Sequence, residues 1–250
     1  MITDPIFYLC AVPAVLCFGM AKGGLGSALS LTAVPLMALA VPPLTAAAIL
    51  LPILLVMDVV AVRSFWREWD SMNLKLTLPG ALLGIVVGTF TFSYLNDDAI
   101  RLLLGIIVVI FIADFLFQSN KPAKAVSLRR GSWWGAVSGF TSFGIHAGGP
   151  PISIFILPQR LPKRQLMGTF AVFFAVVNVI KLIPYGALGQ LSWSNMMTSF
   201  VLMPIAPIGV LLGVYLLDKI SEKSIYSFTY FGLGLLGVKL CYDGITGLFF

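Results

Sequence analysis

The sequence alternates between long apolar runs and short polar connections, and this pattern predicts ten apolar segments. These segments are residues 5–20, 27–41, 45–63, 75–94, 99–118, 131–145, 150–158, 165–185, 194–217 and 224–247. Within each run the apolar residues are continuous, whereas a membrane β-barrel would show alternating polarity in shorter strands. Several runs reach the ~20 residues that a helix needs to cross a bilayer. The pattern therefore predicts an all-α polytopic membrane protein.

Two glycine-rich stretches interrupt this pattern, GMAKGGLGSA at residues 19–28 and GFTSFGIHAGGP at residues 139–150. The segments beside them are short for a bilayer crossing, and the segment at 150–158 is the shortest of all. Every backbone amide in lipid needs a hydrogen-bond partner, so a short segment is tolerated as half of a broken helix or as one arm of a re-entrant hairpin. We therefore expect broken or re-entrant helices at both glycine-rich turns.

Composition and charge agree with a membrane protein. Hydrophobic residues make up 59% of the chain and charged residues only 10%, whereas soluble domains carry about 25% charged residues. The net charge of +6 lies mostly in short loops, which favours membrane topology over nucleic-acid binding. We number the loops between the ten segments in chain order. All but three of the 16 lysines and arginines then lie in the odd-numbered loops, the exceptions being Arg101, Lys181 and Lys239. The positive-inside rule then makes the odd loops cytoplasmic and places both termini outside, in a plasma membrane such as the bacterial inner membrane.

The chain divides into two related halves. The polar, basic stretch 119–130 is the predicted cytoplasmic linker between a first transmembrane repeat at 1–118 and a second at 131–250. Two pairs of positions match at a shift of 120 residues, namely Pro42 with Pro162 and Asp58 with Asn178. Each half has about five segments, an odd number, so the second repeat is inverted relative to the first. Inverted repeats are typical of secondary transporters and place a substrate site near the bilayer midplane.

The glycine clusters are candidate anion sites. A helix that begins after such a turn exposes unpaired N–H groups and the positive end of its dipole, and glycine lets a ligand approach the backbone closely. The glycines concerned are Gly23, Gly24, Gly26, Gly148 and Gly149. The alternative is that these small residues only allow neighbouring helices to pack closely.

Two lysines are candidate ligands for an anion. Lys22 lies inside the first glycine cluster, although an ordinary lysine at the cytoplasmic end of a segment would occupy the same place. Lys181 lies within an apolar segment, where a charged side chain is costly and usually faces a cavity or a partner. Its alternative is to extend to the outer interface. Asn178 lies one turn earlier on the same helical face and is a further candidate.

Asp58 and His146, the only histidine, are the candidates for proton coupling. The Asp58 carboxylate could bind or relay a proton, or could form a structural ion pair with a basic group. Histidine titrates near neutral pH, which suits proton coupling or anion contact, and a hydrogen-bonded packing role is its alternative. Ser27, Ser142 and Thr169 offer hydroxyl donors to an oxyanion, although bonds to the helix backbone are the default for such residues.

Other functional classes find little support. Ser142 and His146 are spaced to meet on a helix as nucleophile and base, but no GxSxG sequence surrounds the serine. One histidine and three scattered cysteines do not form a zinc-binding pattern. The stretch GGLGSALS lacks the GK[ST] of a P-loop, so ATP is not consumed by this chain. We therefore expect no enzymatic activity, no metal and no cofactor.

These features together resemble the TauE/SafE family of sulfite exporters and organosulfur-anion permeases. The resemblance rests on FGMAKGGLGSALSLTAVPLMALAVPP, on SGFTSFGIHAGGPPISIFILPQRLPKRQLMGTFAVFF and on the repeat arrangement, and it covers nearly the whole chain. It implies transport of sulfite, thiosulfate, sulfoacetate or a similar sulfonate, usually as export. The chain departs from the family pattern in having only two glycines directly after Lys22 and in having His146-Ala147 before the second glycine pair.

The combined expectation is a secondary transporter of small sulfur-containing anions that exports its substrate by alternating access around a midplane site. A passive anion channel or a membrane subunit without transport activity is the alternative. The expected partners are the anion, the lipid bilayer and, as a candidate coupling ion, the proton. A homo-oligomer is left open, and no nucleic acid is expected.

Overall fold

The computed structural model describes residues 1–117, 126–217, 219 and 222–249, and every element assigned among them is helical. The first half contains α1 (Pro5–Met20), the π-helical turn η1 (Ala21–Leu25), α2 (Ser27–Ser30), α3 (Ala33–Met37), α4 (Pro43–Ser64), α5 (Ser71–Tyr94) and α6 (Asp97–Phe117). The second half contains α7 (Leu128–Ile145), α8 (Gly149–Ile156), the 3-10 turn η2 (Leu157–Gln159), α9 (Lys163–Ala187), α10 (Trp193–Leu202), α11 (Ile205–Leu216) and α12 (Glu222–Phe249). The predicted all-α class is confirmed for the described residues.

Several helices have the length and apolar character of membrane spans. Within the described residues, four stretches qualify, namely Pro5–Leu25, Pro43–Ser64, Ser71–Tyr94 and Lys163–Ala187. The pair α10 and α11, bent by 44° at a short break, qualifies as a fifth if it forms one span. Large apolar side chains such as Leu83 and Phe90 on α5 are exposed on the outside, as expected for a surface that meets lipid. The chain is therefore an integral membrane protein.

Two predicted segments are divided in the structure. The segment at 194–217 breaks at Met203 and Pro204 between α10 and α11, because proline has no N–H to donate and clashes with the preceding turn. The segment at 27–41 separates into α2 and α3, and the hydroxyl of Thr32 donates to the Leu29 carbonyl (2.8 Å) at the turn between them.

The helix predicted at 131–145 begins earlier than expected. α7 begins at Leu128, where the Ser127 hydroxyl accepts a hydrogen bond from the Arg130 amide (3.4 Å). A side-chain cap of this kind satisfies one of the free amides of a first helical turn. The end of the predicted linker is therefore helical, and its residues up to 125 lie outside the described part of the chain.

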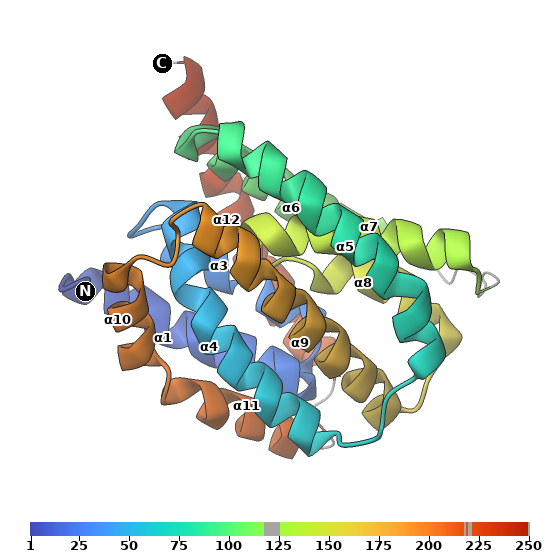
Figure 1. The fold of residues 1–250 in the computed structure, drawn as a ribbon. Coiled ribbons are helices and arrows are strands. Elements are labelled where there is room, and N and C mark those ends of the chain that lie inside the picture. The colour runs from blue at the N-terminus through green and yellow to red at the C-terminus, as the bar shows by residue number, and fades with distance from the viewer. Residues whose placement is uncertain (118–125, 218, 220–221, 250) are drawn as a thin grey trace.

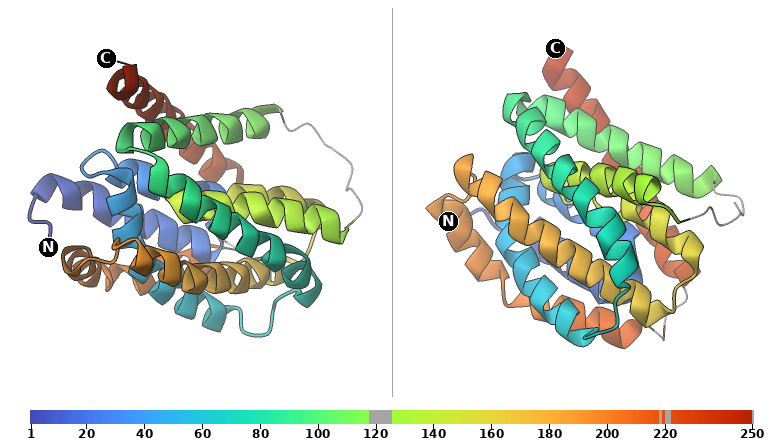
Figure 2. Two further views of the ribbon diagram at one scale, coloured as in Figure 1. Left: turned by 45° about the horizontal axis from the view of Figure 1, so that its top comes forward. Right: turned by 45° about the vertical axis from the view of Figure 1, so that its right-hand side comes forward.

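The helices form four principal pairs, and each pair joins the two halves of the chain. α4 lies beside α9 at the centre, and the two run in opposite directions (Figure 1). α1 packs on α11, and α5 packs on α7. α6 packs chiefly on α12 at the periphery, where the C-terminal end of α12 projects from the rest (Figures 1 and 2). The halves therefore interlock instead of forming separate domains.

Glycines allow two of these pairs to approach closely. In the α5–α7 pair, an added Cβ would lie 2.0 Å from the Ala136 oxygen at Gly84 and 2.1 Å from the Ala81 oxygen at Gly139. In the α1–α11 pair, a Cβ at Gly23 would lie 2.2 Å from a backbone oxygen of α11. Small residues at such contacts are a common basis of helix packing in membranes.

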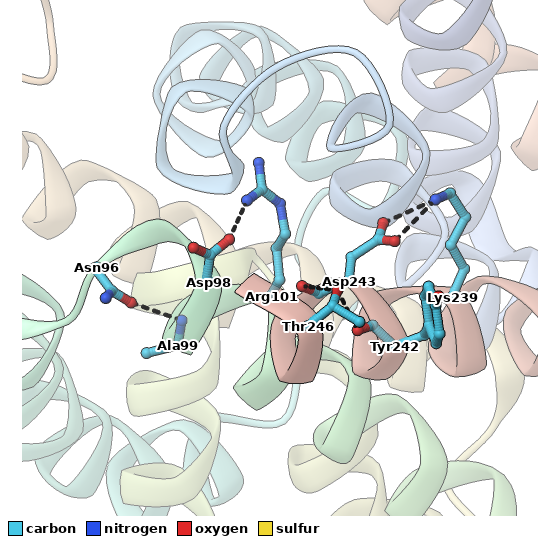
Figure 3. Close-up of polar contacts among 8 residues, drawn as sticks. All are labelled: Asn96, Asp98, Ala99, Arg101, Lys239, Tyr242, Asp243 and Thr246. Carbon is cyan, nitrogen blue, oxygen red and sulfur yellow. Dashed lines mark hydrogen bonds and ion pairs between the residues drawn. The ribbon is translucent and has the colours of Figure 1, made fainter. Parts of the chain in front are cut away.

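The α6–α12 pair carries two of the basic residues that fall outside the odd-numbered loops, and both are neutralised locally (Figure 3). Arg101 donates to Asp98 on its own helix (2.6 Å), and Lys239 donates to Asp243 on its own helix (2.8 Å). The Asn96 side chain caps α6 by accepting a hydrogen bond from the amide three residues on (2.8 Å). Arg101 and Lys239 are therefore each paired with an aspartate on the same helix.

Two contacts show which connections share an end of the molecule. The amino group of Met1 donates to the Ser194 hydroxyl (2.9 Å), so the N-terminus lies beside the α9–α10 connection. At the end of α4, Arg164 donates to Glu68 (2.8 Å), so the α4–α5 and α8–α9 connections meet there. Hydrogen bonding to the Arg164 guanidinium lowers the pKa of Glu68. The shared ends agree with the charge pattern, and the side that faces the cytoplasm stays a prediction.

Candidate functional site

The first glycine-rich stretch ends α1 in a tight, irregular turn. The helix continues as the π-helical turn η1, which contains Lys22, and then Gly24 and Gly26 adopt φ angles of 131° and 101°. Such angles are accessible to glycine but strained for other residues. The following helix α2 is only one turn long, so its dipole is small and the turn supplies positive charge mainly through the Lys22 side chain.

The second glycine-rich stretch separates α7 from α8. His146 adopts a left-handed conformation (φ 54°), and its amide donates to Ser142 O (3.1 Å) while the Ala147 amide donates to Thr141 O (3.2 Å). The bond from the His146 amide to Ser142 O is that of an αL cap, which usually has glycine at the left-handed position. α8 then begins at Gly149, and the prolines of its first turn have no amide hydrogen. The cap therefore fixes the position of the only imidazole in the chain.

A buried carboxylate joins the two halves at the centre. Asp58, on α4, accepts a hydrogen bond from Lys22 Nζ on one oxygen and from Asn178 Nδ2 on the other (2.7 Å). Asp58 is 3% exposed, and the side chain of Lys22 is 7% exposed. The two positions that the sequence relates by a shift of 120 residues, Asp58 and Asn178, are therefore in direct contact.

Lys181 is fully buried and has only neutral acceptors among its hydrogen-bond partners in the described part of the chain. Its Nζ donates to Ser142 O (2.9 Å), to Ser142 Oγ (3.1 Å) and to His146 Nδ1 (2.7 Å). An ammonium has three hydrogens, and these contacts use all three. Lys181 does not reach the outer interface, because it has no exposed surface.

The histidine is held in a neutral form by its contacts. His146 Nε2 lies 2.8 Å from Ala47 O, and because a carbonyl only accepts, Nε2 carries the hydrogen. Nδ1 then accepts from Lys181. The ring also stacks on Tyr185 with centroids 6.3 Å apart, and the Tyr185 hydroxyl donates to Phe143 O (2.6 Å). The imidazole is thus fixed between α4, α7 and α9.

A cavity lies between these groups, and the centres of water-sized molecules can reach a volume of about 40 Å³ inside it. Its polar lining comes from Lys22, Ser30, Ser142, His146 and Asn178, and its backbone lining includes Gly26 and Gly149. The remaining lining residues are apolar, namely Phe18, Ala21, Leu54, Met167, Phe170, Ala171 and Phe174. Lys22 Nζ lies 5.8 Å from the centroid of Phe18 and 5.7 Å from that of Phe174, within range of cation–π attraction.

The predicted site residues fall into three groups. Six line the cavity, namely Lys22, Gly26, Ser142, His146, Gly149 and Asn178. Asp58 and Lys181 lie directly behind this lining and are bonded to it. Gly23, Gly24 and Gly148 instead contact packed neighbours, because added Cβ atoms would meet α11, the Leu217 side chain and α7, respectively.

The hydroxyl candidates Thr169 and Ser27 are not among the residues that the structure places at the cavity. Thr169 accepts from the Asp70 amide (2.9 Å) and donates to Gln165 O (2.7 Å), so it connects α9 to the α4–α5 connection. The side chain of Ser27 lies outside the described part of the structure. Ser142 is the hydroxyl that both lines the cavity and contacts Lys181.

Sequence reasoning did not single out the aromatic side chains around Lys22. Phe18 lies one turn before Lys22, and Phe170 and Phe174 are spaced to share a face of α9. That spacing was a usable signal, but aromatic residues at helical spacing are common in apolar segments. Only the neighbouring ammonium distinguishes this cluster.

The groups around the cavity include more bases than acids. Counted with both lysines protonated, Asp58 ionised and the imidazole neutral, Lys22, Lys181, Asp58 and His146 together carry one positive charge. A charge in the membrane interior costs roughly 2.5–3.5 kcal/mol on insertion scales and usually marks a substrate or ion pathway. The arrangement is therefore suited to receive an anion.

The site is thus a cavity between the helices of an integral membrane protein, with a mostly apolar lining that includes one lysine and one histidine. Residues 11–240 match the family model described as Sulfite exporter TauE/SafE. The chain belongs to this family, which agrees with the resemblance found in the sequence. No curated protein and no solved structure matches the chain.

Proposed function

We propose that this protein is a secondary transporter that exports small sulfur-containing anions such as sulfite, thiosulfate, sulfoacetate or a related sulfonate. The observation that carries the proposal is a buried cluster of two lysines and one carboxylate beside the cavity, which carries one positive charge when all three groups are ionised. Family membership supports the sulfur oxyanion class. The cavity offers a sulfur oxyanion several donors, namely the Lys22 ammonium, the Asn178 amide, the Ser142 hydroxyl and the backbone amide of Gly149.

Lys181 would act on the anion through Ser142. The Ser142 oxygen accepts from Lys181 Nζ (3.1 Å), so its own hydrogen is free to point into the cavity that this residue lines. A hydroxyl polarised by an ammonium is a stronger donor than an isolated one, because neighbouring hydrogen bonds in a low-dielectric interior reinforce each other. The positive charge of Lys181 thereby reaches an anion without direct contact.

The pairing of helices supports two inverted repeats, residues 1–118 and 131–250 joined by the linker 119–130. If the two halves are repeats, α1 corresponds to α7, α4 to α9, α5 to α11 and α6 to α12. The α1–α11 contact of one half should then recur as the α7–α5 contact of the other, and α4 should contact α9 as α6 contacts α12. All four contacts are present. α4 and α9 run in opposite directions, as inversion requires (Figure 1). Their N-caps, Pro42 and Pro162, share nearly the same backbone conformation.

Alternating access would follow from this architecture. The site takes Lys22 and Asp58 from the first half and Ser142, His146, Asn178 and Lys181 from the second, so rocking one half against the other would open it to either side. An inside-negative potential favours anion export by about 2.3 kcal/mol per charge per 100 mV. We assign the linker to the cytoplasm and both termini to the outside.

The proposal is tested by reconstituting the purified protein into liposomes and measuring the flux of radiolabelled thiosulfate and sulfite. We expect saturable uptake that is accelerated by unlabelled anion on the other side, because a carrier exchanges substrate. Lys181→Met should reduce the flux at least about tenfold while folding is retained, since the apolar stem stays packed. Lys239→Met removes a surface lysine from α12 and is the matched control, with flux expected near wild type.

Three results would contradict the proposal. Conductance without saturation or countertransport would indicate a channel. An absence of flux for every anion would indicate a subunit without transport activity. Equal flux in the Lys181→Met and Lys239→Met variants would remove the buried charge from the mechanism.

A further inference from the structure

In this structure the Asp58 carboxylate pairs with Lys22, whose side chain also lines the cavity. We propose that Asp58 is a resident counter-anion, and that the bound substrate and Asp58 together supply two negative charges to the two buried lysines. A dianion would then bind together with one proton, and a monoanion would bind without one. This inference rests on the proposed function and specifies the charge class and proton linkage of its substrate.

The contacts of Asp58 allow its carboxylate to take up a proton while the surrounding site stays folded. Lys22 lines the cavity, whereas Asp58 lies behind it, so an anion in the cavity and Asp58 approach the same ammonium from different directions. The other Asp58 oxygen accepts from Asn178 Nδ2 (2.7 Å). If Asp58 takes up a proton, rotation of the Asn178 amide presents an oxygen that accepts the new O–H hydrogen.

The neighbouring groups single out Asp58 as the proton acceptor. The titratable side chains around it are Lys22 on η1, Lys181 on α9 and His146 at the end of α7. We count both lysines as protonated, because Lys22 pairs with Asp58 and Lys181 Nζ has three acceptors around it. His146 Nδ1 faces Lys181 Nζ, so a second proton on the ring would then place like charges together. The helices α10 and α11, which also pack on α4, contain no charged residue.

Charge counting then gives different outcomes for the two classes of anion. With Asp58 ionised, a bound monoanion brings the net charge of the buried cluster to zero. A dianion would leave one negative charge, which is costly in a low-dielectric interior. Transfer of one proton from water to an Asp58 oxygen restores neutrality, and no covalent bond to the substrate forms or breaks.

The inference is tested by calorimetric titration of the full-length wild-type protein with thiosulfate and with ethanesulfonate. Thiosulfate stays doubly charged and ethanesulfonate singly charged from about pH 6 to 8, so any pH dependence reports the protein. Repeating each titration in buffers of different ionisation enthalpy gives the number of protons taken up. We expect about one proton per thiosulfate, with affinity falling up to about tenfold per pH unit as the pH rises. Binding of ethanesulfonate should be accompanied by no proton uptake, and its affinity should not depend on pH.

Asp58→Asn provides the second arm, because asparagine is nearly the same shape and cannot titrate. This variant should bind thiosulfate without proton uptake and without pH dependence, and its preference for thiosulfate over ethanesulfonate should increase. The control is Asp243→Asn, which removes a surface carboxylate from α12 and should behave as wild type. If Asp58→Asn does not fold, the proton count of the wild type decides the question by itself.

The possible outcomes separate this inference from the proposed function. Equal proton uptake with both anions, or none with either, would overturn the proposal that a dianion binds with one proton and a monoanion with none. Anion transport would be left intact. Unchanged proton uptake in a folded Asp58→Asn variant would assign the proton to another group and overturn the role of Asp58. Binding of neither anion by the wild-type protein would refute the proposed function and, with it, this inference.

Discussion

The two glycine-rich breaks are similar in composition but contribute to the site in different ways. At residues 19–26 the chain turns through positive-φ glycines into a helix of one turn, and the break delivers a charged side chain, Lys22. At residues 144–149 it turns through a left-handed histidine into a longer helix, and the break delivers a neutral imidazole and positions Ser142. In each case one non-glycine side chain carries the chemistry, while several of the glycines allow close packing.

This comparison changes the meaning of the glycine clusters. A run of glycines between membrane segments suggests backbone amides aimed at a ligand, and Gly26 and Gly149 do line the cavity. Gly23 and Gly148, however, face backbone atoms of α11 and α7 at distances that exclude any side chain. The general lesson is that glycine in such a turn reports a close approach, and the tertiary structure determines whether the neighbour is ligand or protein.

The largest effect is expected from removing the charge of the first break. Lys22→Met leaves the Asp58 carboxylate buried without its cation, which should cost about 3–5 kcal/mol of stability and abolish thiosulfate binding. Thermal unfolding in detergent and calorimetry measure the two effects. The double variant Lys22→Met/Asp58→Asn should recover much of the stability but none of the binding. Recovery of both would show that Lys22 serves only the fold.

A smaller effect is expected from disturbing the packing of the first break. Gly23→Ala would place a Cβ 2.2 Å from the Val210 oxygen and force α1 and α11 apart, at a cost of about 1–3 kcal/mol. Binding by the molecules that remain folded should be near normal. The control is Gly186→Ala, because nothing lies within 4 Å of an added Cβ there. A large loss of affinity at unchanged stability would instead place Gly23 at the ligand.

The smallest effect is expected from the second break. His146→Asn keeps a residue that tolerates the left-handed conformation but removes the bond to Ala47 O and the acceptor for Lys181. Of these two bonds, the one from Lys181 affects the site, and its loss should weaken thiosulfate binding by about fivefold, or about 1 kcal/mol. Binding titrations on the two variants compare the breaks directly. A loss as complete as that of Lys22→Met would make the imidazole a principal ligand.

Much of the fold and part of the site could be predicted from local sequence. Continuous apolar runs predicted the helices, and α4 begins at Pro43, because the first position of a helix needs no amide hydrogen. The rarity of charge in apolar segments identified Lys22, Asp58 and Lys181, since lipid makes such residues costly. The aromatic residues around Lys22 were not predicted, because phenylalanine in an apolar segment is unremarkable by itself.

The sequence by itself therefore determined the membrane class, the approximate positions of most helices and the identity of the buried charges. Only the tertiary structure decided which of these charges meet. The contact between Asp58 and Asn178 depends on how α4 and α9 cross, and the placement of Lys181 on Ser142 and His146 depends on how α9 packs against the end of α7. Hydrophobic periodicity specifies which residues are buried but not which helix they face, because lipid and protein interiors are equally apolar surroundings for a helix.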